Sequence, residues 1–167
     1  ALYFYSYTSS SYAEHLIAVL PEISTSLYPM NGNQMTLWAR YSNYPATLLV
    51  GTMTDPTDFS TFVINDTLEL TSTYREYVVR FHSTGAYPAI MMLKSSSNQY
   101  AYVDDITIDI APSCPKPLYI SVDNITENSA SFSWTPGGNE AQWEVKCVSD
   151  DNTDIQTLTA TSNPFVF

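Results

Sequence analysis

Apolar residues recur at every second position along most of the chain, and no segment sustains the spacing of an amphipathic helix. Successive side chains of a strand point to opposite faces, so this period predicts β-strands with one face toward a core. Turn-forming segments such as MNGN, TDPTD and TPGGNE separate the apolar runs at intervals of about ten residues, which is typical of sandwiches and jelly rolls. We therefore predict an all-β protein. The predicted strands cover residues 2–7, 15–23, 34–42, 46–54, 62–70, 76–84, 89–95, 100–110, 118–125, 129–136 and 141–149.

Two predictions of local structure stay open at this stage. Residues 14–20 fit a helical turn as well as the start of a strand, because the apolar run there is short and continuous. The last segment, from residue 152 to residue 167, has no clear period and receives no assignment.

The segment YAYVDDITIDI, residues 100–110, places two adjacent carboxylates inside an otherwise regular strand pattern. Ile106, Ile108 and Ile110 mark the even positions as the core face, and the same alternation puts Asp104 on that buried side and Asp105 toward solvent. An uncompensated buried carboxylate costs several kcal/mol by rough transfer estimates. Four compensations are open: backbone N–H donors, a cationic partner, a bulge that turns Asp104 outward, or a bound cation.

A second acidic segment, TMTDPTDFS, contains Asp55 before Pro56 and Asp58 before Phe59. Aspartate side chains in such positions accept hydrogen bonds from backbone N–H groups a few residues later, and proline fixes the turn. We therefore interpret these carboxylates as turn-forming groups in preference to metal ligands.

The segment DIAPSCPKPLYI divides the chain. Its three prolines, at positions 112, 115 and 117, remove backbone donors and impose extended geometry, so neither a helix nor a central strand passes through it. We predict one domain over residues 1–111, a proline-rich linker over residues 112–117, and a second β-segment over residues 118–167.

Charge and composition exclude several function classes. With 6 Lys and Arg against 17 Asp and Glu, the formal charge is −11. This charge repels nucleic-acid phosphates and anionic lipid surfaces, so we predict neither nucleic-acid binding nor membrane insertion. No apolar run approaches the roughly 20 residues that a bilayer span needs.

Catalytic motifs are also missing from the sequence, which contains only two histidines and no G-x-S-x-G elbow. The chain is therefore predicted not to be an enzyme.

Candidate ligand-binding residues share strand faces. Trp38 and Arg40 lie opposite Leu37 and Ala39 in MTLWAR, and Arg80 and His82 similarly share a face. Aromatic rings beside guanidinium groups suit sugar recognition, because the ring covers an apolar sugar face while arginine binds hydroxyl groups. Tyr3, Tyr5 and Tyr7 also alternate, as a tyrosine stripe. The alternative interpretation, which the sequence favours, is that Trp38 fills the core and the tyrosines pack at its margin.

Whole-pattern similarity connects the first domain with a known family. AVLPEI, MTLWARY, LLVGTMTDPTDFSTFV, YREYVVRF and YVDDITI, in this order, resemble the MAM-like jelly-roll modules of bacterial surface proteins, the cleaved-adhesin or choice-of-anchor group. SASFSWTP and QWEV, after a proline-led strand, resemble the first half of a fibronectin type III domain. The resemblance implies a jelly-roll β-sandwich followed by a partial fibronectin type III-like β-sandwich, with the first domain truncated at its N-terminal edge and the second at its C-terminal edge. In a fibronectin-type sandwich the first and third strands run in the same direction, so the resemblance places Cys114 and Cys147 at opposite ends and implies two unpaired thiols.

This resemblance also implies a metal site. Such jelly rolls hold a structural calcium ion, Ca2+, at an acidic pair like Asp104 and Asp105, which offers one answer to the buried carboxylate; a bulge without an ion is the other.

The resemblance further implies a function, that of a noncatalytic adhesion or carbohydrate-binding module, extracellular or on the cell surface, whose partner is a glycan or a host or cell-surface protein. The alternative is a spacer domain of a larger secreted peptidase or glycoside hydrolase. Open sheet edges lead us to predict self-association.

Overall fold

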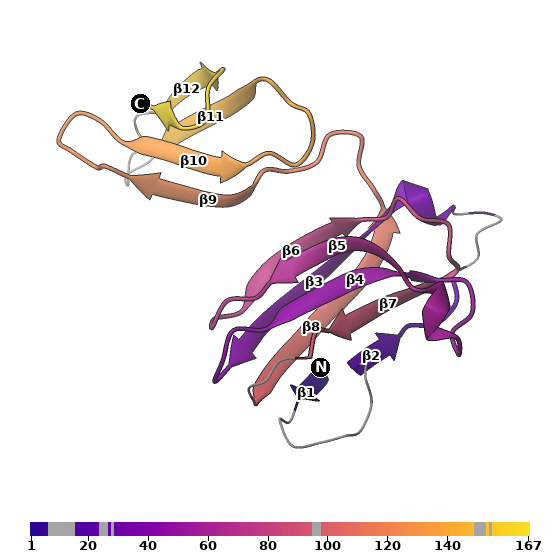
Figure 1. The fold of residues 1–167 in the computed structure, drawn as a ribbon. Coiled ribbons are helices and arrows are strands. Elements are labelled where there is room, and N and C mark those ends of the chain that lie inside the picture. The colour runs from indigo at the N-terminus through magenta and orange to yellow at the C-terminus, as the bar shows by residue number, and fades with distance from the viewer. Residues whose placement is uncertain (7–15, 24–26, 28, 95–97, 149–152, 154) are drawn as a thin grey trace. The chain divides into compact units, whose positions relative to one another are not determined.

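The protein, analysed as a computed structural model, consists almost entirely of antiparallel strands in two compact units, residues 1–111 and residues 112–167 (Figure 1). The structure describes all residues except 7–15, 24–26, 28, 95–97, 149–152 and 154. Each of the two units is considered by itself.

The first unit is an eight-stranded sandwich. Its strands are β1 (Leu2–Ser6), β2 (Leu16–Val19), β3 (Asn33–Ser42), β4 (Thr47–Met53), β5 (Val63–Glu69), β6 (Arg75–Arg80), β7 (Tyr87–Met92) and β8 (Gln99–Ile110). One sheet has the order β1-β8-β3-β6 and the other the order β2-β7-β4-β5, which is the double Greek-key order of a jelly roll. Short 3-10 turns cover Met30–Gly32 and Phe59–Thr61. The prediction of an all-β fold is confirmed.

The core lies between these two sheets and follows the alternation of the sequence. In β3, Met35, Leu37 and Ala39 are fully buried, and across the sandwich Leu48, Val50, Ile90 and Met92 from β4 and β7 are buried as well. Trp38 is 41% exposed, so the prediction that it fills the core is wrong. The reason is its parity: Trp38 alternates with the buried residues of its own strand and points away from the core.

Strand β8 changes its buried face halfway along its length. Gln99, Ala101 and Val103 are buried before Asp104, whereas Ile106 and Ile108 pack against the core after it. The expectation that all even positions face the core, and that Asp104 is therefore buried, is wrong. The second half of the strand behaves as predicted except for Ile110, which is 66% exposed.

A β-bulge causes this change of face. Thr36 pairs with Thr107 and Trp38 pairs with Asp104, so that Leu37 alone stands opposite two residues, Asp105 and Ile106. Asp105 adopts a left-handed backbone conformation with φ of 48°. An extra residue in one strand moves every later side chain to the other face, which is how β8 keeps apolar residues inside along both halves.

The second unit contains two small sheets. Strands β9 (Leu118–Asp123), β10 (Ser131–Thr135) and β13 (Phe165–Val166) form one sheet in the order β13-β10-β9, and β11 (Trp143–Val148) pairs with β12 (Ile155–Ala160). The indole rings of Trp134 and Trp143 meet edge to face at 5.1 Å. Among its described residues, Ala160 is the one hydrophobic side chain that is fully buried. Strands β12 and β13 fall in the segment that the sequence left unassigned.

The described residues confirm strands in the positions of all eleven predicted ones. For the open assignment at residues 14–20, the described part forms the strand Leu16–Val19, and residues 14 and 15 lie outside the described chain. Cys114 and Cys147 are both free thiols in the structure. The predicted truncations and self-association stay predictions.

Candidate functional site

The outward side of the sheet β1-β8-β3-β6 carries a dense group of aromatic side chains. We call this group the aromatic face; it consists of Tyr3, Tyr5, Trp38, Tyr74, Tyr100 and Tyr102. It is built by the alternation that places Phe4, Leu37, Ala39, Ala101 and Val103 in the core and therefore sends their neighbours outward. Tyr7, the third member of the predicted tyrosine stripe, lies outside the described residues.

Antiparallel pairing sets these side chains in three rows across the strands. Asp104, Trp38 and Glu76 form the first row, from β8 through β3 to β6. Tyr3, Tyr102 and Arg40 form the second row, from β1 through β8 to β3. Tyr5, Tyr100 and Ser42 form the third. Adjacent rows are two residues apart along each strand, which corresponds to about 7 Å.

The tyrosines of the second and third rows contact one another. The rings of Tyr5 and Tyr100 stack with centroids 4.8 Å apart, and Tyr3 lies 6.0 Å from Tyr100 and 5.2 Å from Tyr102. Partial burial, and then the neighbouring Tyr102 and Tyr100 hydroxyls, raise the pKa of Tyr3 above its ordinary value of 10.0. The Tyr3 hydroxyl is therefore a neutral hydrogen-bond donor at physiological pH.

Arg40 continues this series of rings. Its guanidinium carbon lies 4.6 Å from the centroid of the Tyr102 ring and 5.2 Å from that of Tyr74. A guanidinium between two aromatic rings is held by cation–π attraction, and its planar group keeps N–H donors at its edge. Within the described chain, no carboxylate forms an ion pair with Arg40 and no acceptor takes a hydrogen bond from it.

Trp38 differs from the tyrosines of the aromatic face. It is 41% exposed, and within the described chain its side chain has neither a ring contact nor a hydrogen bond. An exposed indole beside a fixed guanidinium gives a ligand an apolar surface and a set of directed donors. Trp38 and Arg40, two of the four residues predicted for ligand binding, thus come together.

Arg80 and His82 lie elsewhere. Arg80 pairs with Gln34 near the far end of β6, four residues from Glu76, which corresponds to about 13 Å. His82 is exposed beyond the end of that strand. The structure therefore does not bring these two residues to Trp38, and the candidate site consists of Trp38, Arg40, Tyr102 and Asp104.

Sequence reasoning missed Tyr74 and Tyr102, the two rings that hold Arg40. The assumption of one unbroken alternation placed Tyr100 and Tyr102 on the core face together with Asp104. The two adjacent carboxylates are the signal that would have found them, because a bulge at that point moves both tyrosines outward.

The acidic pair predicted to bind calcium takes part in the bulge. The Asp104 side chain is 48% exposed, and its Oδ1 accepts a hydrogen bond of 3.0 Å from the Asp105 backbone N–H and lies 3.5 Å from the Ala1 ammonium. Ala1, Leu2, Val103, Asp104, Asp105 and Ile106 line a small pocket of about 170 Å³.

These groups do not make up a calcium site by themselves. Calcium takes six to eight oxygen ligands. The described residues contain no group of three His, Cys, Asp or Glu side chains able to hold a metal ion. The bulge and the backbone donor account for Asp104 without one, so we prefer the bulge without an ion; the calcium ion that the resemblance implies stays untested.

The acidic turn at residues 55–61 behaves as predicted. Asp55 Oδ1 accepts hydrogen bonds from the backbone N–H of Thr57 at 2.8 Å and from its hydroxyl at 2.7 Å. Asp58 Oδ1 accepts equivalent bonds from Ser60 at 2.9 and 2.7 Å. The interpretation of both carboxylates as turn-forming groups is confirmed.

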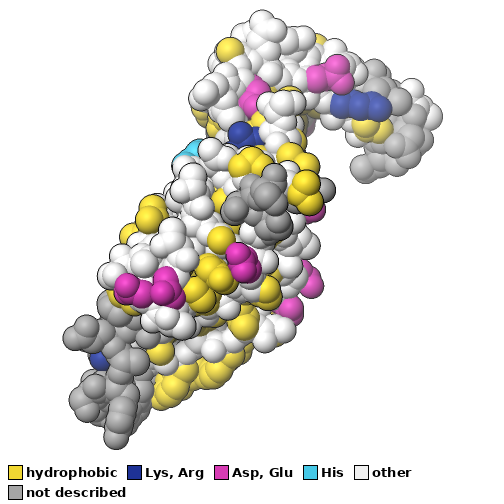
Figure 2. All heavy atoms as spheres, turned by 90° about the vertical axis from the view of Figure 1, so that its right-hand side faces the viewer, with side chains coloured by type: hydrophobic (Ala, Val, Ile, Leu, Met, Phe, Trp, Pro, Cys, Tyr) yellow, Lys and Arg dark blue, Asp and Glu magenta, His cyan; other side chains and the backbone are white. Residues whose placement is uncertain are grey.

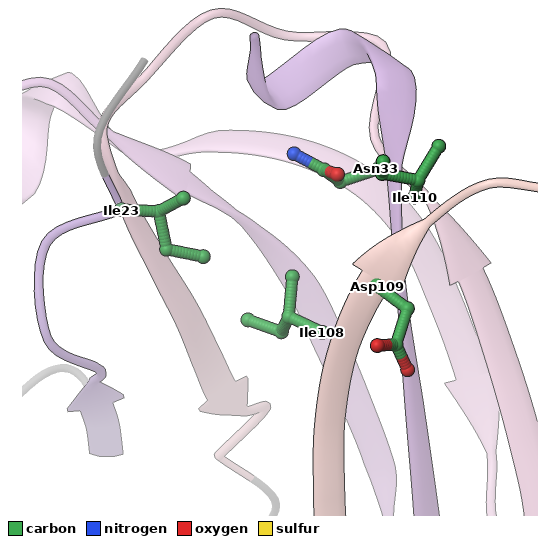
Figure 3. A pocket seen from close by; sticks show the side chains of 5 residues that line it. All are labelled: Ile23, Asn33, Ile108, Asp109 and Ile110. Atoms are coloured by element: carbon green, nitrogen blue, oxygen red, sulfur yellow. The ribbon is translucent and has the colours of Figure 1, made fainter. Parts of the chain in front are cut away.

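A pocket of about 540 Å³ in the first unit belongs to the margin of the core. It is lined by Ile23, Asn33, Ile108, Asp109 and Ile110, and Ile23 and Ile108 point toward each other across it (Figure 3). Both of these isoleucines also pack against the main core. This pocket is therefore the open end of the sandwich, and the aromatic face remains the better candidate site.

On the face drawn in Figure 2, the basic side chains of the described residues do not gather into one patch. On the same face, acidic side chains occur in several small groups separated by uncharged ones. The described residues include no helix with the length and hydropathy that crossing a bilayer requires.

Comparisons with known proteins support the fold. No family model and no curated protein matches the sequence. A solved structure, the K1 cleaved adhesin domain of Lys-gingipain from Porphyromonas gingivalis W83, is similar with a TM-score of 0.52 and 18% identity over 66% of this chain and 73% of that one. A second, described as a CBM4, has a TM-score of 0.42 and 17% identity over 65% of this chain and 82% of that one, too low a score to add to the argument. The chain thus has the β-sandwich fold seen in an adhesin domain.

Proposed function

We propose that this chain is a noncatalytic module of an extracellular or cell-surface protein and that it binds carbohydrate through the aromatic face. The observation that carries the proposal is Trp38, an exposed indole without a ring partner, two residues from an arginine that Tyr74 and Tyr102 hold in place. The similarity to a cleaved adhesin domain supports an adhesive role, and the two-sheet arrangement of the second unit supports its resemblance to a fibronectin type III domain.

Sugar binding needs the two kinds of contact that this site offers. A pyranose presents an apolar C–H face, which an indole covers, and a rim of hydroxyl groups, which need donors and acceptors. Arg40 supplies donors, and the Asp104 carboxylate, half exposed, supplies acceptor oxygens. Because two rings already hold the Arg40 side chain in place, that side chain loses less conformational entropy when a ligand binds.

The arrangement favours binding over catalysis. Paired carboxylates that hydrolyse a glycosidic bond must flank it. On the aromatic face, Asp104 and Glu76 stand on either side of Trp38 in one row of the sheet, so the indole, and not a substrate bond, lies between them.

Glycan-array screening of the intact chain tests the proposal, followed by titration calorimetry with the best ligand. Trp38→Ala is expected to weaken binding by about tenfold or more, because it removes the stacking surface at the centre of the site. Trp38→Phe should retain part of the affinity, since a smaller ring still stacks. Tyr119→Ala, which changes an exposed tyrosine of the other compact unit, is the control and should bind normally.

Two outcomes would contradict the proposal. The first is the absence of any glycan hit for a chain whose circular dichroism shows a folded β-protein, which would favour the spacer role. The second is a hit whose affinity is the same in the Trp38→Ala variant, which would place the ligand elsewhere.

A further inference from the structure

The three rows of the aromatic face differ in charge: the first is negative, the second positive and the third uncharged. Two carboxylates, Asp104 and Glu76, stand directly opposite Trp38 on its two neighbouring strands. The next row carries the cation Arg40 beside Tyr102, and the third carries only Tyr5, Tyr100 and Ser42. Opposite charges therefore occupy adjacent rows, which are about 7 Å apart along the strands.

From this pattern we infer that the site selects neutral, hydroxyl-rich glycans and rejects both acidic and basic ones; the inference rests on the proposed carbohydrate-binding role. A ligand placed on Trp38 reaches both rows at once. Arg40 would attract a carboxylated or sulfated sugar and Asp104 would repel it, and an amino sugar would experience the reverse. Hydroxyl groups donate to the carboxylates and accept from the guanidinium, so a neutral sugar uses both rows.

The charges of the site are positioned for this role. Arg40 is held by the rings of Tyr74 and Tyr102 and has no carboxylate partner within the described chain, so its N–H donors face the ligand instead of an internal ion pair. Asp104 is fixed by the hydrogen bond from the Asp105 N–H to its Oδ1 and by the Ala1 ammonium 3.5 Å from the same oxygen, and the bulge keeps its side chain outward. Two side chains of opposite sign are thus fixed in adjacent rows without neutralising each other.

The charge of the whole protein adds to the selection against acidic glycans. At −11 the chain repels polyanions before contact, and this repulsion is strongest at low salt. Binding of a neutral glycan should depend little on salt, whereas the affinity of an ion-paired ligand falls as salt rises.

Matched pairs of oligosaccharides test the inference on the intact chain. In each pair the backbone is the same and only the charge differs: methyl-esterified against free oligogalacturonate, and N-acetylated against deacetylated chito-oligosaccharide. A glycan array that includes neutral, acidic and basic members is screened first, and the dissociation constants of both pairs and of the best array hit are then measured at low and high salt. The neutral member of any pair that binds should bind about tenfold more tightly than its charged counterpart.

Charge-removing variants give a second readout that a merely structural role would not produce. Arg40→Gln keeps hydrogen-bonding atoms and removes the cation, so it should improve the relative binding of the basic member of a pair. Asp104→Asn removes an anion and should improve the relative binding of the acidic member. Asp109→Asn, an exposed aspartate in the same strand outside the aromatic face, should change neither preference.

The outcomes separate the inference from the proposed function. Binding confined to acidic or basic glycans, with strong salt dependence, overturns the inference and leaves carbohydrate binding intact. Neutral hits whose preferences do not respond to Arg40→Gln or Asp104→Asn overturn the assignment of these two residues. No binding to any class of glycan overturns the proposed function itself.

Discussion

Trp38 and Asp104 stand directly opposite each other on strands β3 and β8, both on the outward side of the sheet. The bulge lies immediately after Asp104. Trp38 pairs with Asp104, and the residue of β3 before it, Leu37, lies opposite two residues of β8, Asp105 and Ile106. The bulge thus does two things. It keeps apolar residues inside along both halves of β8, and it puts a carboxylate beside the exposed indole.

The backbone of Asp105 should control the stability of the bulge. Its φ of 48° is a left-handed conformation, which costs a β-branched residue more than aspartate and costs glycine almost nothing. Asp105→Val is expected to lower the free energy of unfolding by about 1 to 3 kcal/mol, and Asp105→Gly to leave it unchanged or raise it slightly. Urea denaturation measures both. Asp109→Val, in ordinary strand geometry, is the control, and an equal loss there would refute the backbone explanation.

Calcium should have no effect on melting. Asp104 is turned outward and receives a backbone hydrogen bond, so its charge is compensated without an ion. Differential scanning fluorimetry with added calcium and with chelator is expected to give the same melting temperature. A rise with calcium that disappears in Asp104→Asn would instead establish the metal site that the family resemblance implies, because a ligand that binds only the folded state raises its stability.

Gly51 should tolerate no side chain. A Cβ at this position would lie 2.2 Å from the Val63 carbonyl oxygen and 2.9 Å from the Phe62 ring, at the point where the register of β4 and β5 shifts. Backbone must move to make room, so Gly51→Ala is expected to lower the free energy of unfolding by about 1 to 3 kcal/mol. Gly32→Ala is the matched control, since a Cβ there would meet no atom within 4 Å. Equal stability of the two variants would contradict this prediction, because it would show that β4 and β5 can move apart enough to admit a methyl group.

The turn formed by Asp55 should lose stability in acid. Hydrogen bonds from the Thr57 hydroxyl and backbone N–H lower the pKa of Asp55 below its ordinary value of 3.8. A lowered pKa in the folded state means that the carboxylate contributes stability above the unfolded value, and that this contribution disappears as pH falls through the folded value. Asp55→Ala should therefore be less stable than the parent protein at neutral pH and equally stable well below pH 3.8. Chemical denaturation across this pH range checks it, and a difference that does not change with pH would contradict it.

The sequence by itself determined the strands of this protein from β1 to β11, though not β12 and β13, and the alternation within most of them. Period two along β3 puts Met35, Leu37 and Ala39 on one face and Trp38 and Arg40 on the other, because side-chain direction in a strand is a local property of the backbone. It did not decide which face is buried, and the prediction that Trp38 fills the core was wrong. The turn at Asp55 was predictable because it is also local, since its hydrogen bonds reach only two residues along the chain.

Only the tertiary structure decided which side of β8 is buried and which residues meet on the aromatic face. One extra residue at Asp105 reverses the alternation, and a bulge depends on the pairing partner, which in this chain is β3, more than 60 residues away in the sequence by the register of Trp38 and Asp104. The same holds for Arg40, whose two aromatic neighbours come from β8 and from the residue before β6. Contacts between distant strands follow from register and burial together, and neither is a property of any one segment.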